Sequence, residues 1–242
     1  MTPYATPADR ARALYRLPTA PRRNRTLEIC QAHPPLLAGG RWPGEGHVSC
    51  VVDAAPTAAL PVAAGSTLAS LRPGAQLPFG RQSFDLVILH QTLDDLAAAS
   101  ADFDAQAFLD QVAEVLVTGG LVAGCVRRRD SLPARLRRLS RRLRLAGPAA
   151  DEPRFSLAGL RQALETAHFS GIRTFALLPS CDAPLKIVDT DPEVSRVAFR
   201  REVDARRRHL HGLAFLLRQI AAEIGLFSQL ESSIFFWAYK PC

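Results

Sequence analysis

Several patterns that would place this chain in a special class of protein are missing. About eighteen consecutive apolar residues are needed to cross a bilayer as a helix, and the sequence contains no such run. The first 25 residues lack the apolar centre of a secretory signal peptide. The sequence therefore predicts no transmembrane segment and no secretory signal.

Cysteine spacing excludes two further classes. The five cysteines are odd in number, scattered and never spaced as CxxC: Cys30, Cys50, Cys125, Cys181 and Cys242. This pattern favours neither a disulfide framework nor a zinc site. We expect free thiols, no bound metal and a reducing, cytoplasmic setting.

What the chain does contain is ordinary for a globular protein. Its 242 residues are 48% hydrophobic and 22% charged, which suits one large α/β domain. The net charge is +7, and almost all the cations are arginine. A basic protein of this kind favours an anionic partner, such as nucleic acid, an anionic membrane or an acidic protein.

The most informative stretch spans residues 77–124. An apolar run at 84–89 predicts a strand buried on both faces. Apolar residues then recur at helical spacing over 108–116, Thr118-Gly119-Gly120 is expected to stop that helix, and residues 121–125 predict another strand. Strand, helix and strand in this order form a βαβ unit, which implies a parallel sheet flanked by helices.

The motifs LPF, SFDLVILHQTLDDL and FLDQVAEVLVTGGLVAG in this stretch resemble strands four and five of class I S-adenosylmethionine-dependent methyltransferases, of the methyltransferase type 11 kind. The match covers about 48 residues closely. The resemblance implies an α/β fold with a doubly wound, mostly parallel seven-stranded sheet of the Rossmann-like type. It also implies S-adenosylmethionine as cofactor, with Leu77, Pro78 and Phe79 beside the adenine.

The first predicted strand, residues 25–30, departs from that family. The family reads VLEIGCGxG here, whereas this chain reads TLEICQAHPP, with Pro34 and Pro35 where the loop continues. The resemblance implies that Glu28, Cys30 and Gln31 occupy cofactor-binding positions, but the glycines that let a backbone approach the ligand are absent. Either the cofactor sits differently, or the pocket no longer holds it.

Residues 47–53 predict a second strand, and residues 67–71 a third. Asp53 ends the second strand, where the resemblance implies an acid that accepts hydrogen bonds from the ribose hydroxyls. An aspartate that forms a turn before Ala54-Ala55-Pro56 is an equal alternative.

His90 follows the fourth strand directly. Ligands of doubly wound sheets bind outside the carboxyl ends of strands, and histidine titrates near neutral pH, so His90 is the candidate catalytic base. The alternative is a polar helix start capped by Thr92 or Asp94.

Arginine-rich segments lie from Arg127 to Arg144 and from Arg200 to Arg208. In the first, Leu136, Leu139 and Leu143 share one helical face. Such a helix can lie on an anionic membrane, contact phosphates or bind a protein partner. The alternative is a surface helix that packs its leucines inward and leaves its arginines in water.

The predicted organisation is a basic N-terminal arm over residues 1–25, with a short helix at 11–17, followed by a single domain over 26–242. A helix after Phe155 and a strand at 172–178 precede a helical insertion at about 180–230, which holds a loop at 182–193 and a long helix at 197–224. Aromatic and β-branched residues at 233–239 predict the last strand, antiparallel to its neighbours.

Two main functions remain open from the sequence. The first is a methyltransferase that acts on an unidentified anionic or macromolecular acceptor, with His90 facing that acceptor. The second is an inactive pseudoenzyme that serves as an accessory or scaffold subunit through its basic surfaces. A nucleic-acid-binding module rests on charge alone.

Overall fold

The computed structural model describes residues 6–16, 25–31, 47–52, 67–71, 76–100, 102–142, 155–178, 180–181, 184, 186–191, 194 and 232–242. Their helices and strands follow one another as α1 (Pro7–Arg16), β1 (Thr26–Gln31), β2 (His47–Val52), β3 (Thr67–Leu71), β4 (Phe84–His90), α2 (Thr92–Ala99), α3 (Ala105–Val115), β5 (Leu116–Arg127), α4 (Leu132–Arg142), α5 (Leu157–Thr166), β6 (Ser170–Leu178), β7 (Lys186–Asp189) and β8 (Ser233–Tyr239).

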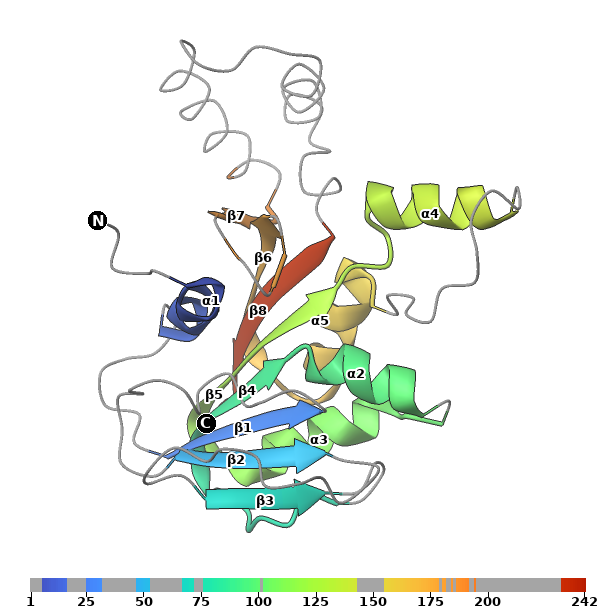
Figure 1. Cartoon of the computed structure of the whole chain (residues 1–242). Coiled ribbons are helices and arrows are strands. Elements are labelled where there is room, and N and C mark those ends of the chain that lie inside the picture. The colour runs from blue at the N-terminus through green and yellow to red at the C-terminus, as the bar shows by residue number, and fades with distance from the viewer. Residues whose placement is uncertain are drawn as a thin grey trace.

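The strands form one open mixed sheet with the order β3-β2-β1-β4-β5-β8-β6-β7 (Figure 1). Parallel pairing joins the strands from β3 to β5. β8 lies between β5 and β6 and is antiparallel to both, as predicted for the last strand. The predicted mostly parallel, α/β architecture is therefore confirmed within the described residues.

The strand count differs from the prediction. Seven strands were expected, whereas the described sheet has eight. The additional strand, β7, falls inside the segment 182–193 that was predicted to be loop. Its four residues are too few for a clear local pattern, and it forms by antiparallel pairing with Phe175–Leu178 at the sheet edge. The long helix expected at 197–224 lies outside the described residues.

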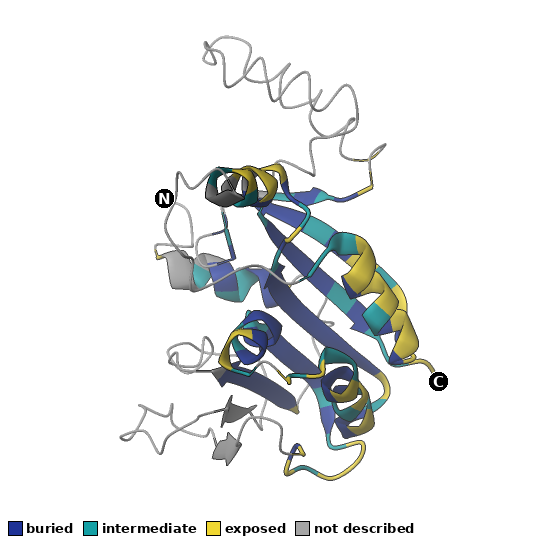
Figure 2. Ribbon diagram, turned by 90° about the vertical axis from the view of Figure 1, so that its right-hand side faces the viewer, coloured by how far each residue is buried: buried dark blue, intermediate teal, exposed yellow. Residues whose placement is uncertain are grey.

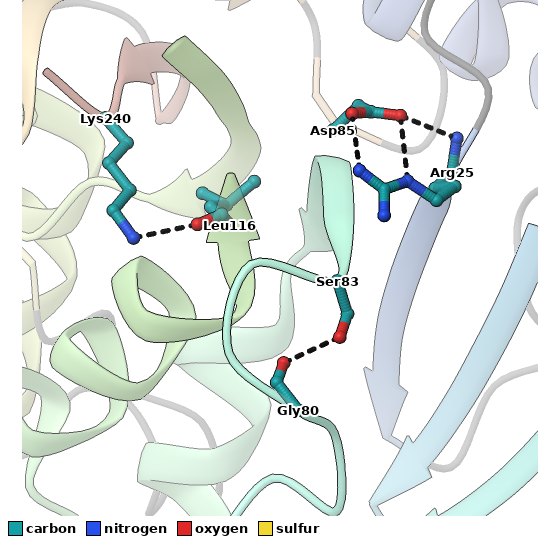
Figure 3. Close-up of polar contacts among 6 residues, drawn as sticks. All are labelled: Arg25, Gly80, Ser83, Asp85, Leu116 and Lys240. Carbon is teal, nitrogen blue, oxygen red and sulfur yellow. Dashed lines mark hydrogen bonds and ion pairs between the residues drawn. The ribbon is translucent and has the colours of Figure 1, made fainter. Parts of the chain in front are cut away.

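Helix α3 also ends earlier than the glycine pair suggested. It stops at Val115, and Leu116 is already extended with φ −76° and ψ 140°. Gly119, at φ 72°, lies inside β5, where the pairing with β4 is irregular. The start of β5 is held by Lys240, whose ammonium group donates to the Leu116 carbonyl at 2.8 Å (Figure 3).

Alternation along the strands divides the core between the two faces of the sheet. One face packs against α2, α3 and α5 through Leu27, Val87, Val122 and their neighbours. On the other face, Leu14 and Tyr15 of α1 pack in one cluster with residues of the strands: Leu86, Ile88, Leu121, Ala123, Cys125 and Phe235. Figure 2 shows the strands buried between these layers and the outer sides of the helices exposed.

The N-terminal helix packs against the sheet through Ala11, Leu14 and Tyr15, which are all buried. Thr6 and Asp9 fix its start by reciprocal capping: the Asp9 amide donates to the Thr6 hydroxyl, and that hydroxyl donates to the Asp9 carboxylate at 2.7 Å. The helix predicted at 11–17 therefore begins earlier, at Pro7.

Strands β1 and β4 are also joined at their amino ends. Asp85 accepts hydrogen bonds from the backbone amide of Arg25 at 3.0 Å and from its guanidinium at 3.2 Å (Figure 3). The turn before β4 is closed by the Ser83 hydroxyl, which donates to the Gly80 carbonyl at 2.8 Å. Among the described helices, none is long and apolar enough to cross a bilayer.

Candidate functional site

The site is built at the carboxyl ends of β1, β2, β4 and β5, which we call the carboxyl edge. β1 and β4 are neighbours there, but the chain continues from β1 towards β2 and from β4 towards β5. This reversal is the topological switch point, where ligands of doubly wound sheets bind. Gln31 ends β1 and His90 ends β4, so both lie at this point. Asp53, Pro34 and Pro35 lie outside the described residues.

Backbone bonds fix the turn that follows His90. Gln91 adopts a left-handed conformation at φ 58°, and its amide donates to the Cys125 carbonyl on β5 at 3.1 Å. The Thr92 hydroxyl donates to the Ile29 carbonyl on β1. The turn therefore ties the ends of β1, β4 and β5 together.

The predicted helix start after His90 is confirmed, but the cap is not the residue expected. Gln91 occupies the N-cap position and makes no side-chain capping bond. Thr92 is instead bonded to β1, and the Asp94 carboxylate accepts a hydrogen bond from the backbone amide of Arg127. Both side chains bond to backbone groups of neighbouring strands instead of capping the helix. Such long-range contacts cannot be predicted from local sequence.

His90 belongs to a polar cluster between the sheet and α1, formed with Tyr15, Cys125 and Cys181. The Tyr15 hydroxyl lies 2.8 Å from Nδ1 of His90, and the Tyr15 ring meets Phe235 edge-on at 5.5 Å. Cys125 is the residue of β5 paired with His90. Tyr15, Cys125 and Cys181 are buried, whereas His90 is half-buried at the carboxyl edge.

The cluster perturbs its titratable groups. Burial raises the pKa of the Cys125 thiol, but hydrogen bonds from Cys181 and His90 outweigh it and lower that pKa to about 6. Burial and, after it, the neighbouring Cys125 raise the pKa of the Cys181 thiol well above its usual value. The same two causes raise the pKa of the Tyr15 hydroxyl. The neighbours of Cys125 thus favour its ionised form.

This arrangement can orient an imidazole for proton transfer. In the tautomer with a proton on Nδ1, His90 donates to the Tyr15 oxygen, and Nε2 is then the basic ring nitrogen. Burial and the neighbouring Cys125 raise the pKa of Tyr15, so the hydroxyl keeps its own proton while it accepts from His90. A half-buried imidazole held in this way has one ring nitrogen fixed by Tyr15 and the other left for proton transfer.

Glu28 and Cys30 lie beneath the carboxyl edge. Both are buried, and they alternate with Leu27 and Ile29, which pack on the opposite face of the sheet. The charge of Glu28 contributes to the raised pKa of Tyr15, which places this carboxyl group near the cluster. The structure therefore brings Glu28 and His90 into one polar region.

The residues at 77–79 are not brought to this region. The Leu77 amide donates to the Gln111 side chain on α3 at 2.9 Å, and Phe79 packs edge-on against Phe84 at 5.1 Å. Pro78 is exposed. Phe84 begins β4 and His90 ends it, so the length of the strand, about 20 Å, separates Phe79 from His90.

Tyr15, Cys125 and Cys181 were not identified as site residues from the sequence. Tyr15 lies in a segment read as a basic arm, and the thiols lie in apolar surroundings. The spacing of Ala11, Leu14 and Tyr15 on one helical face was the available signal for a docked helix. Among the described residues, no group of three or more histidines, cysteines or acids could hold a metal ion.

No protein-family model matches the chain, and no curated protein matches it. Solved structures do. A Thermotoga maritima protein, described as an S-adenosylmethionine-dependent methyltransferase and possible histamine N-methyltransferase, aligns with a TM-score of 0.56 at 14% identity, over 95% of this chain and 86% of that one. An Archaeoglobus fulgidus S-adenosylmethionine-dependent methyltransferase aligns with a TM-score of 0.52 at 12% identity, over 97% and 95%. The chain has the class I methyltransferase fold.

The methyltransferase fold does not by itself define the reaction. The [4+2]-cyclase SpnF aligns with a TM-score of 0.53 at 12% identity, over 97% of this chain and 80% of that one. A protein described as a cyclase thus shares the architecture with proteins described as methyltransferases. The activity has to be argued from the site.

Proposed function

We propose that this chain binds S-adenosylmethionine at the carboxyl ends of β1 and β2 and transfers its methyl group to an acceptor that lies over His90. The observation that carries the proposal is the position of His90. It ends β4 at the switch point of a methyltransferase-fold sheet, half-buried and hydrogen-bonded to Tyr15.

The chemistry of the described residues fits this cofactor, which carries a positive sulfonium. The carboxyl group of Glu28 lies buried beneath the carboxyl edge, and Cys125 has a pKa of about 6 because hydrogen bonds outweigh its burial. A polar, hydrogen-bonding environment of this kind near the switch point, with an ionisable thiol, favours a cationic ligand. Gln31, the last residue of β1, and Asp53, which follows β2 in the sequence, would bind the cofactor, with Asp53 accepting hydrogen bonds from the ribose hydroxyls.

When bound, S-adenosylmethionine supplies an electrophilic methyl group. The protein has to hold the acceptor in line and remove its proton where the acceptor must lose one. His90 takes that proton at Nε2, and Tyr15 fixes the ring by accepting from Nδ1. The arginine-rich surfaces then select an anionic or macromolecular acceptor.

A second candidate is a pseudoenzyme that acts as an accessory or scaffold subunit. The residues from the end of β1 onward favour it, because Gln31, Ala32 and His33 carry side chains where a glycine loop would approach the cofactor, and two prolines follow. Such a protein would bind partners through its basic surfaces without using the cofactor.

Calorimetric titration with S-adenosylmethionine and S-adenosylhomocysteine distinguishes the methyltransferase from the pseudoenzyme. The methyltransferase proposal expects micromolar binding that Asp53→Ala weakens by about tenfold, the loss of one to two hydrogen bonds. Asp110→Ala, on the exposed side of α3, is the matched control and should bind as the wild type does. No heat and no thermal shift at millimolar ligand would overturn the proposal and favour the scaffold.

His90 has its own test once an acceptor is found among anionic candidates. His90→Gln should leave cofactor binding within about twofold and lower methyl transfer by about 100-fold. A loss of cofactor binding instead would show that His90 holds the cofactor and does not act on the acceptor.

A further inference from the structure

Helix α4 turns its apolar side towards solvent. Leu132, Leu136 and Leu139, which we call the leucine stripe, are 42%, 56% and 53% exposed. Spacings of four and three residues place them on one face of the helix. Among the described residues, the only other large exposed hydrophobic side chain is Val194, so three of the four gather on this helix.

The opposite side of α4 is the one that packs. Ala134 is 6% exposed, and at 100° per residue it lies about 160° around the helix from Leu136. Arg138 lies nearer to Ala134 and is half-buried. The expectation that the leucines pack inward with the arginines in water is therefore wrong for the described part of this helix.

The direction of the leucine stripe is set by a rigid anchor at the start of α4. The buried Ser131 hydroxyl accepts from the Ala134 amide and donates to the Arg128 carbonyl at 3.1 Å. Arg128 is also buried and pairs with Asp130 at 2.7 Å, while its amide donates to the Ser232 carbonyl at 2.7 Å. These bonds tie the start of the helix to the end of β5 and to Ser232, directly before β8. They therefore oppose a rotation of α4 about its own axis that would bury the leucine stripe.

The segment that carries the leucine stripe is strongly basic. Residues 127–145 contain nine arginines and one acid, Asp130, and that acid is already paired with Arg128. Arg135 is exposed and lies one turn from Leu132 and Leu139. Figure 1 shows α4 beyond the end of β5, standing away from the body of the sheet.

We infer that α4 docks the protein on an anionic lipid bilayer, with the leucine stripe at the acyl-chain boundary and the arginines among the lipid phosphates. A bilayer accounts for both kinds of side chain. Transfer of the leucines out of water is favourable, and the guanidinium groups pair with phosphate. A nucleic acid would engage the arginines but leave the leucines in water, so it fits only half of what is exposed. This inference does not depend on the methyltransferase proposal.

The test is flotation of the full chain with vesicles of phosphatidylcholine alone or mixed with phosphatidylglycerol. We expect binding to the anionic vesicles at least tenfold stronger than to the neutral ones, and weaker binding at high salt. Leu136→Ser combined with Leu139→Ser should reduce that binding by about tenfold or more, because two leucines lose their apolar contact.

Two charge variants complete the design. Arg135→Gln should weaken vesicle binding several-fold, whereas Arg81→Gln, the same change at an exposed arginine before β4, is the matched control and should not change it. Because all substituted side chains are exposed or half-exposed, circular dichroism should show unchanged folding. The inference is overturned if neutral and anionic vesicles bind alike, if the double leucine variant binds as the wild type does, or if the chain binds RNA or an acidic protein but neither vesicle.

Discussion

The Tyr15 hydroxyl lies 2.8 Å from Nδ1 of His90, although 75 residues separate them in the chain. Tyr15 comes from α1 and His90 from the end of β4, so this bond connects the N-terminal helix with the switch point of the sheet. Any ligand at the carboxyl edge must reach His90 from its exposed side. The orientation of the imidazole consequently depends on whether α1 is docked.

Replacing Tyr15 with phenylalanine tests that connection. Tyr15→Phe keeps the ring against Phe235 and removes the hydrogen bond, so we expect the free energy of unfolding to fall by about 1 kcal/mol. Urea denaturation measures this directly. The imidazole signals of His90 should also shift in an NMR titration, because Nδ1 loses its partner. Unchanged stability together with an unchanged titration would contradict the connection.

The thiol of Cys125 makes stability depend on pH. Burial raises the pKa of Cys125, but hydrogen bonds from Cys181 and His90 lower it to about 6 in the folded protein, from an ordinary value of 9.0. Between these values the unfolded chain holds a proton that the folded protein has released, so this contribution to stability is full above pH 9 and is lost as the pH falls through 6.

Cys125→Ala removes that dependence. Urea midpoints measured between about pH 6 and 9 should rise with pH more steeply in the wild type than in the variant. The ultraviolet absorbance of the wild type should also show a thiolate that titrates near pH 6 and disappears in Cys125→Ala. Parallel stability curves for the two proteins would show that the thiol stays protonated.

Gly124 is required by close packing between β5 and its neighbours. A Cβ at this position would lie 2.6 Å from the Phe236 ring and 2.9 Å from the Leu89 carbonyl oxygen. Gly124→Ala should therefore lower the free energy of unfolding by about 1–3 kcal/mol. The matched control is Gly80→Ala, whose Cβ would meet only the Ser83 hydroxyl at 3.3 Å. Equal thermal midpoints for the two variants would refute this account.

Most of the central sheet could be predicted because its strands carry their own signal. Phe84–His90 and Ser233–Tyr239 are apolar runs, and the structure buries nearly all of their side chains. Such a run is unfavourable in water, and its short length with β-branched and aromatic residues favours a buried strand. β7 could not be predicted in this way, since four residues hold no clear period and the strand exists through its pairing with β6.

The candidate site was predicted only in part. His90 could be placed at the end of a strand, because the length of an apolar run shows where the strand stops. The other members of the cluster could not, because Tyr15 reaches His90 and Cys181 reaches Cys125 from segments distant in sequence. Leu77 and Phe79 were expected near the ligand from family position, yet they pack at the other end of β4.

By itself, the sequence determined where the main strands and helices lie and the parallel order implied by the βαβ unit, because hydrophobic periodicity acts over a few residues. Only the tertiary structure decided which side of α4 faces the protein. The pattern of α4 left open whether its leucines are buried or exposed, whereas the structure buries Ala134 beside the bonds of Ser131 and Arg128 and leaves the leucines exposed. Local periodicity defines an apolar face, and long-range contacts determine where that face points.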